Sequence, residues 1–197
     1  MTAWRLALLF VLLPALARAG ETDAMAYMRL LADRALNELT RPMPPEQRVA
    51  GVRRLLDEHF DVGATGRFAL GRAGHGAEAA ERGRFQAAFE DWMVRTVAGG
   101  LESYDGGTIR FHPARPGGEG TTIVPSEYVA AEGPTVRIDW TLRPERESWR
   151  VADFTIEGMG FGMLLRSGIA AAAERVGGRL DGLTSRLGGF SDIAKRR

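Results

Sequence analysis

The spacing of apolar residues changes twice along this chain, from a helical repeat before Asp105 to strand alternation after it, and back to a helical repeat after Gly158. The middle region is divided by short turns rich in glycine and proline, at residues 116–118, 132–134 and 144–145. Connections this short join antiparallel neighbours. The pattern therefore predicts an antiparallel sheet of four strands, at residues 108–112, 121–129, 135–143 and 148–156.

The third of these strands has one apolar face. Val136, Ile138, Trp140 and Leu142 alternate with polar residues, which predicts one buried side and one wet side. The fourth strand alternates less cleanly, so we expect apolar material on both of its faces.

Helices are predicted on both sides of this sheet region. Their apolar residues recur at three- and four-residue spacing, Pro45 suits a first helical position, and Asp61 is a plausible N-cap. The expected helices lie at residues 24–39, 45–60, shortly after Asp61, at 78–101, and twice after Gly158. No repeat or long linker divides them. The fold class is therefore α+β: a four-stranded antiparallel sheet clasped by N- and C-terminal helices in one domain, residues 20–197.

The N-terminus has the features of a secretory signal. Arg5 precedes a short apolar run, and Ala17-Arg18-Ala19 fits a cleavage site, so residues 1–19 are expected to be removed. The mature chain would carry 26 − 2 = 24 basic and 25 acidic residues, a formal charge of −1, which gives no footprint for nucleic acid. The chain has no cysteine, so no disulfide or thiolate chemistry is available. We expect the mature protein to be exported as a soluble monomer.

Few residues are arranged for metal or nucleotide chemistry. His59, His75 and His112 are scattered, without the converging ligands that a metal needs. The glycines of 158–162 follow a strand and precede a helix, but the register of a dinucleotide loop would require a glycine at Leu165. We expect no metal site, no cofactor and no catalytic residues.

A catalytic function is an alternative, because the strands carry several carboxylates. Asp139, Asp153 and Glu157 could do acid–base work. A half-buried Asp153 paired with Arg150 or Arg166 is the commoner explanation.

Residues 148–166 combine a strand with an apolar segment that carries the single charge of Arg166. Together with the wide aromatic face expected over 78–101, this region offers more aromatic and methionine side chains than a small core needs. Such side chains are typical of adaptable apolar cavities.

Several segments match, in order, those of a known family. They are Phe60-Asp61 with Gly71-Arg72, FQAAFEDWMVRTVAGGLESY at 85–104, W-R-V-x-D-x-x-I-E-G at 149–158, and Arg166-Ser167 followed by Gly177-Gly178 and Asp181-Gly182-Leu183. Over most of the mature chain the sequence resembles the MlaC family, the toluene-tolerance-type periplasmic phospholipid-binding proteins. Ala152 and Leu165 depart from the tyrosines that the family often has, as in a divergent branch found with hopanoid-synthesis genes.

The resemblance implies an NTF2-like fold and a lipid carrier. Such a carrier ferries phospholipid across the periplasm, between an outer-membrane lipoprotein–porin complex and an inner-membrane ABC transporter complex with an MCE-domain ring, and so serves outer-membrane lipid asymmetry. Its cargo would be a phospholipid or a hopanoid-like lipid.

On this interpretation the acyl chains lie between the sheet and the helices. Arg166, and less directly Arg95, would lie near the phosphate, although Arg166 could instead pair with Glu157 or Asp153. The residues expected to line the cavity are Phe89, Trp92, Met93, Val97, Ile138, Trp140, Phe154, Ile156, Met159 and Leu165.

Two other functions are compatible with the sequence. An NTF2-like enzyme acting on an apolar substrate would use Asp153 or Asp139 as a base in the cavity. A non-lipid interaction protein of the envelope would have a filled core and an exposed apolar patch.

Overall fold

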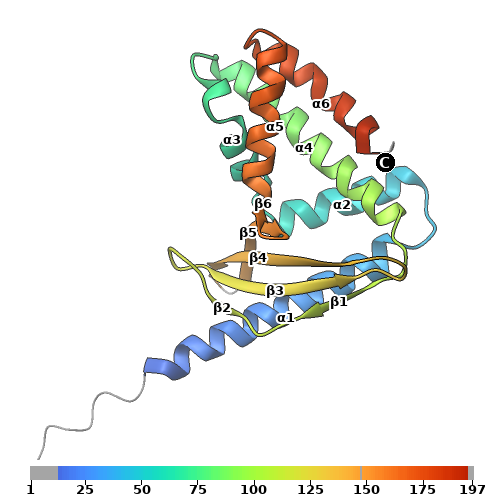
Figure 1. Ribbon diagram of the computed structural model, residues 1–197, viewed down its shortest axis with the longest axis vertical. Helices are drawn as coiled ribbons and strands as arrows, with labels where there is room; N and C mark the ends of the chain where they lie inside the picture. The colour runs from blue at the N-terminus through green and yellow to red at the C-terminus, as the bar shows by residue number, and fades with distance from the viewer. Residues whose placement is uncertain (1–12, 147, 195–197) are drawn as a thin grey trace, which may run out of the picture.

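The computed structural model describes residues 13–146 and 148–194 (Figure 1). Most of the expected signal segment, residues 1–12, lies outside them, and its removal stays a prediction. The helices are α1 (Leu13–Leu39), α2 (Pro45–His59), α3 (Val62–Leu70), the 3₁₀ helix η1 (Gly71–Gly74), α4 (Ala79–Glu102), α5 (Phe161–Arg175) and α6 (Leu180–Ala194). None of the helices in these two ranges is both long and apolar enough to cross a membrane.

The sheet confirms the predicted fold class and extends it. Its strands are β1 (Thr108–Phe111), β2 (Arg115–Pro116), β3 (Thr122–Val129), β4 (Thr135–Glu145), β5 (Ser148–Ile156) and β6 (Met159–Gly160). The order is β1-β3-β4-β5-β6, all antiparallel, with β2 beside β3. The four predicted strands are present. The two additional strands have two residues each, which is too short to leave an alternating pattern in the sequence.

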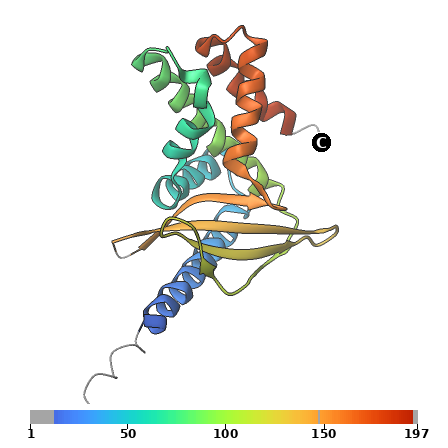
Figure 2. The ribbon, with the colours of Figure 1, turned by 60° about the vertical axis from the view of Figure 1, so that its left-hand side comes forward.

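The helices form two groups around this sheet (Figures 1 and 2). Helix α1 crosses the sheet, where Ala24, Met28 and Leu31 are buried with Val124 and Leu142. Helices α3 to α6 stand together beyond the β5–β6 side. Their core is separate, and its largest fully buried side chains are Phe85, Phe89, Leu183 and Val52. The protein therefore has two hydrophobic cores, one on the sheet and one between helices.

The segment between α2 and α3 joins the two cores. Phe60 makes an isolated parallel bridge with Val151, and the amide of Asp61 donates to the Val151 carbonyl at 2.9 Å. The side chain of Asp61 then accepts from the amide of Ala64 at 3.1 Å, as expected of an N-cap. Pro45 begins α2, also as expected. Leu55 and Phe60 pack against both cores.

Arg48 is a buried cation that holds the connection between α1 and α2. Its side chain donates to the carbonyls of Leu39 at 2.9 Å and Arg41 at 3.1 Å, and lies 3.7 Å from the carboxylate of Glu102. We expect Arg48→Ala to lower the free energy of unfolding by about 2 kcal/mol, because the carbonyls lose their charged donor. Urea unfolding measures the change. Arg54→Ala, an exposed arginine of the same helix, should change it by less than about 0.5 kcal/mol, and equal effects of the two would contradict the role of Arg48.

Candidate functional site

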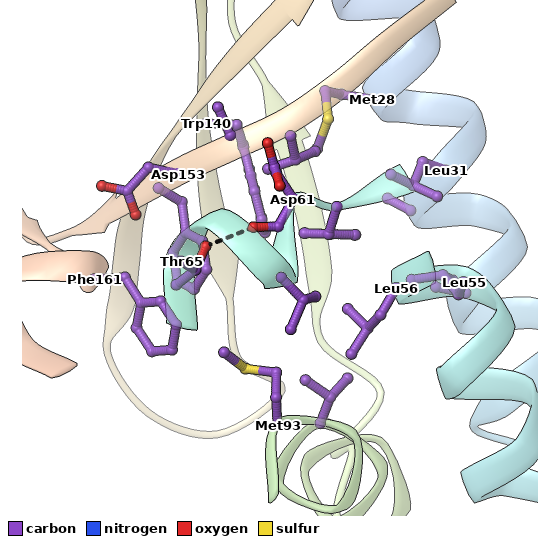
Figure 3. A pocket seen from close by; sticks show the side chains of 18 of the residues that line it. Met28, Leu31, Leu55, Leu56, Asp61, Thr65, Met93, Trp140, Asp153 and Phe161 are labelled. Carbon is purple, nitrogen blue, oxygen red and sulfur yellow. Dashed lines mark hydrogen bonds between the residues drawn. The ribbon is translucent and has the colours of Figure 1, made fainter. Parts of the chain in front are cut away.

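A cavity of about 370 Å³ lies where the two cores meet (Figure 3). Its volume falls in the range of small-molecule sites, about 300 to 1,000 Å³. Helix α1, helices α2 to α5 and strands β1, β4 and β5 all contribute to its wall. The lining residues are Met28, Leu31, Ala32, Ala35, Leu36, Leu55, Leu56, Phe60, Asp61, Val62, Thr65, Met93, Thr96, Val97, Leu101, Ile109, Phe111, Trp140, Val151, Ala152, Asp153, Phe154 and Phe161.

The aromatic part of this wall is held in place by its neighbours. The indole of Trp140 donates to the hydroxyl of Ser126 at 2.9 Å, and that hydroxyl donates to the carbonyl of Ile138 at 3.1 Å. The Trp140 ring also lies against Phe154, which stacks on Phe161 with ring centroids 4.4 Å apart. These contacts fix the rings, so their faces form a preformed apolar surface.

Polar side chains are few on the wall, and two of them already have partners. The two carboxylate oxygens of Asp61 accept from the Ala64 amide and, at 2.9 Å, from the guanidinium of Arg143. The hydroxyl of Thr65 donates to the Asp61 carbonyl at 3.0 Å. These groups therefore serve the start of α3 and its attachment to the sheet.

Asp153 has a different partner from the one that the sequence suggested. Its Oδ1 accepts from the amide of Gly162 at 3.2 Å, so it caps the first turn of α5. The expected pairing with Arg150 or Arg166 is wrong. Arg150 donates to the carboxylate of Glu145 at 2.7 Å and to the carbonyl of Phe60, and Arg166 lies over the ring of Phe68. The turn after β5 brings a backbone amide to Asp153 instead of an arginine.

Asp139, the other base considered from the sequence, lies away from the cavity. Its carboxylate accepts from Arg115 at 3.1 Å and from Arg137 at 3.2 Å on the opposite face of the sheet from Trp140. Within the described ranges, no three His, Asp or Glu side chains are grouped as a metal would require.

The residues expected to line a lipid cavity fall into several places. Met93, Val97, Trp140 and Phe154 lie on the cavity wall. Phe89 is fully buried in the helical core, and Trp92 and Leu165 pack against that core. Ile138 and Ile156 are half-buried partners across β4 and β5, and Met159 is exposed.

Arg166 lies against an aromatic ring. Its guanidinium carbon is 5.1 Å from the ring centroid of Phe68, a cation–π contact. A Cβ on Gly71, whose φ is +47°, would stand 3.1 Å from that guanidinium. Gly71 therefore supplies both a left-handed backbone position and the room that Arg166 occupies. Across the described ranges, Arg166 makes no ion pair with Glu157 or Asp153.

Arg95 lies on the outer side of α4. It donates to Asp91 at 2.7 Å, and Arg53 donates to the other oxygen at 2.8 Å. The hydrogen bond from Arg95, with that from Arg53, lowers the pKa of Asp91 below its ordinary value. Arg95 is thus part of a surface network with α2, away from the cavity wall.

Much of the wall was not anticipated. The apolar spacing of residues 24–39 predicted a helix but gave no sign of a cavity. Met28, Leu31 and Leu36 nevertheless line the cavity, together with Phe60, Phe111 and Phe161 from three other elements. Their only signal was apolar spacing, which core residues share.

The comparisons with known proteins agree with this geometry. The family described as MlaC protein matches residues 28–188. The solved structure of a phospholipid-binding protein from Ralstonia solanacearum, in complex with a phospholipid, superposes with a TM-score of 0.70 at 23% sequence identity. The match covers 88% of this chain and 99% of that one. At this identity the likeness shows a shared fold.

Proposed function

This chain belongs to the MlaC family, and we propose that it is a carrier that holds a phospholipid, or a hopanoid-like lipid, with its apolar chains in the cavity between the two cores. The observation that carries this proposal is the cavity itself, which is preformed, about 370 Å³ in volume and almost wholly apolar. The structural neighbour from Ralstonia solanacearum was solved with a phospholipid, and it shares this fold.

The energetics of burial suit a carrier. Each methylene removed from water contributes about 0.8 kcal/mol. Two buried acyl chains would give on the order of 20 kcal/mol, near the upper limit of non-covalent affinity. A lipid held so firmly would leave into water too slowly to be useful, so it has to pass directly from one apolar site to another.

Direct transfer requires docking partners. We propose the two assemblies that the family resemblance implies, an inner-membrane ABC transporter complex with an MCE-type ring and an outer-membrane lipoprotein–porin complex. A location in the periplasm follows from the same proposal and from the signal-like N-terminus.

Of the residues expected to touch lipid, Met93, Val97, Trp140 and Phe154 are the ones whose placement favours it. Phe60, Phe111, Phe161 and the α1 side chains complete the proposed surface. For Arg166 we propose a bracing role, since its guanidinium fixes α5 against Phe68 of α3.

A carrier is favoured over an enzyme by the state of the polar groups on the wall. Acid–base catalysis generally needs a base and a group that orients it or completes the proton transfer. Asp139 lies away from the cavity, and Asp61 is occupied by Arg143 and by the α3 amide. Asp153 lies on the wall, but its Oδ1 caps α5, and among the described residues Asp61 is the only other titratable side chain that lines the cavity. A filled core, expected of a pure interaction protein, does not describe the region around Trp140.

Native mass spectrometry of the freshly purified protein tests the proposal. We expect complexes with one lipid that survive purification, and after delipidation we expect uptake from phospholipid vesicles. A delipidated protein that gains no lipid from vesicles would contradict the carrier function. Bovine carbonic anhydrase, taken through the same steps, serves as a control for non-specific adducts.

A further inference from the structure

Two polar groups on the cavity wall have hydrogen-bonding capacity that the described residues leave unused. One is Oδ2 of Asp153, whose other oxygen alone has a partner, the Gly162 amide. The second is the hydroxyl of Thr96 on α4, which is buried without a hydrogen-bond partner. A buried polar group without a partner is costly, so the Thr96 hydroxyl favours a ligand that completes it. The Oδ2 of the half-buried Asp153 is available to a hydrogen-bond donor.

The Oδ2 atom of Asp153 lies on the side of Gly160 and Gly162. A Cβ on Gly162 would stand 3.5 Å from Oδ2 and 3.3 Å from the ring of Phe68, and one on Gly160 would stand 4.0 Å from Oδ2 and 3.9 Å from Met163. The two glycines therefore add no side chain of their own next to this oxygen, and the neighbouring Phe68 and Met163 are exposed. Figure 3 shows Asp153 on the side of Phe161 and Thr65, away from Leu31 and Leu55. Asp153 therefore lies at one end of the cavity, and apolar side chains such as Leu31 and Leu55 lie at the other.

The charge of Asp153 is not balanced by a cation within the described residues. Arg166 stacks on Phe68, Arg150 lies on Glu145, and Arg143 is paired with Asp61. In the part of the chain that the structure describes, no arginine or lysine lines the cavity. A phosphate or any other anion would meet a like charge here, whereas an ammonium group would meet its complement.

From these groups we infer that the cavity selects lipids whose headgroup carries a cationic amine, and that Asp153 is the residue that sets this preference. A carboxylate only accepts hydrogen bonds, so it requires a donor. The Thr96 hydroxyl can donate, and it suits an ester or phosphate oxygen of the same lipid. The inference rests on the carrier function proposed above and specifies its cargo.

The test is a competition between two phospholipids with identical acyl chains. The delipidated protein is incubated with vesicles of equal parts phosphatidylethanolamine and phosphatidylglycerol, and native mass spectrometry gives the ratio of the two complexes. We expect the ethanolamine lipid to be enriched by about fivefold or more, as befits one charge-assisted hydrogen bond at a half-buried site. In Asp153→Asn the ratio should return to that of the vesicles.

Asparagine is chosen because its amide oxygen can still accept from Gly162, so the start of α5 is retained. Asp139→Asn is the matched control, since it removes a half-buried carboxylate of the same sheet that lies off the cavity. It should keep the wild-type ratio. Far-ultraviolet circular dichroism confirms that each variant is folded.

The outcomes separate the two proposals. Uptake of both lipids by the wild type in the vesicle ratio would overturn the headgroup inference alone. Enrichment that survives Asp153→Asn would overturn the role of Asp153. Failure to take up either lipid would overturn the carrier function, and this inference with it.

Discussion

Val97→Trp should exclude lipid from the protein while leaving its fold intact. Val97 lies on the cavity wall in the C-terminal part of α4, so an indole at this position would project into the space that the acyl chains are proposed to fill. Each methylene that is kept out of the cavity lowers the binding free energy by about 0.8 kcal/mol. Losing only two of them would weaken binding by about tenfold, and a tryptophan should exclude more than two.

A competition for limiting lipid measures this effect. Equal amounts of delipidated wild type and Val97→Trp share a substoichiometric supply of phospholipid, and native mass spectrometry resolves the two proteins by mass. Ala87→Trp is the matched control, because it places the same side chain on the exposed side of the same helix. Equal loading of the wild type and Val97→Trp would show that this cavity is not the lipid site.

The opposite result is expected for Phe89, which lies on the same helix, eight residues before Val97. Phe89 is fully buried among Phe85, Trp92 and the backbone of Gly66. We expect Phe89→Ala to lower the free energy of unfolding by about 3 to 5 kcal/mol, because a large side chain leaves a void in a packed core. The change is measured by urea unfolding of the delipidated protein, since bound lipid would itself stabilise the fold.

Phe68→Ala is the control for this measurement. Phe68 is 44% exposed and contacts Arg166, so its removal should cost less than about 1.5 kcal/mol. The folded fraction of Phe89→Ala should still bind lipid. A loss of lipid uptake with little loss of stability would mean that Phe89 contacts the cargo directly, as the sequence first suggested.

The fold could be predicted to a large extent because its elements are long and strongly periodic. Strand β5 was predicted with the observed bounds, and β1, β3 and β4 were predicted to within two residues at each end. The start of α2 at Pro45 and the cap of α3 at Asp61 were also visible, since each depends on a local preference of one residue type. The strands β2 and β6 were not, because their pairing depends on neighbours brought in by the tertiary fold.

The site was harder to predict for a physical reason. On α4, Phe89 and Met93 are one helical turn apart and equally apolar, yet Phe89 faces other helices and Met93 faces the cavity. Periodicity identifies side chains that avoid water, but it does not tell whether they meet another side chain or a space. The partner of Asp153 was missed for a similar reason, because a backbone amide carries no sequence signal.

Ala152 shows how a departure from the family pattern can matter. It lies on the cavity wall, where the family often has tyrosine, whereas Leu165 packs against the helical core. A small side chain at position 152 leaves the wall beside Asp153 and Phe154 without an aromatic ring. Of the two departures from the family's motifs, the one at position 152 therefore lies on the cavity wall, and the one at position 165 lies in the helical region.

The meeting of two cores at Phe60 and Leu55 has a mechanical consequence. Each core is packed within itself, and the cavity occupies the seam between them. A lipid in that seam would contact side chains of both cores and so add to the contacts that hold them together. A loaded molecule is then expected to resist relative movement of the two cores more than an empty one.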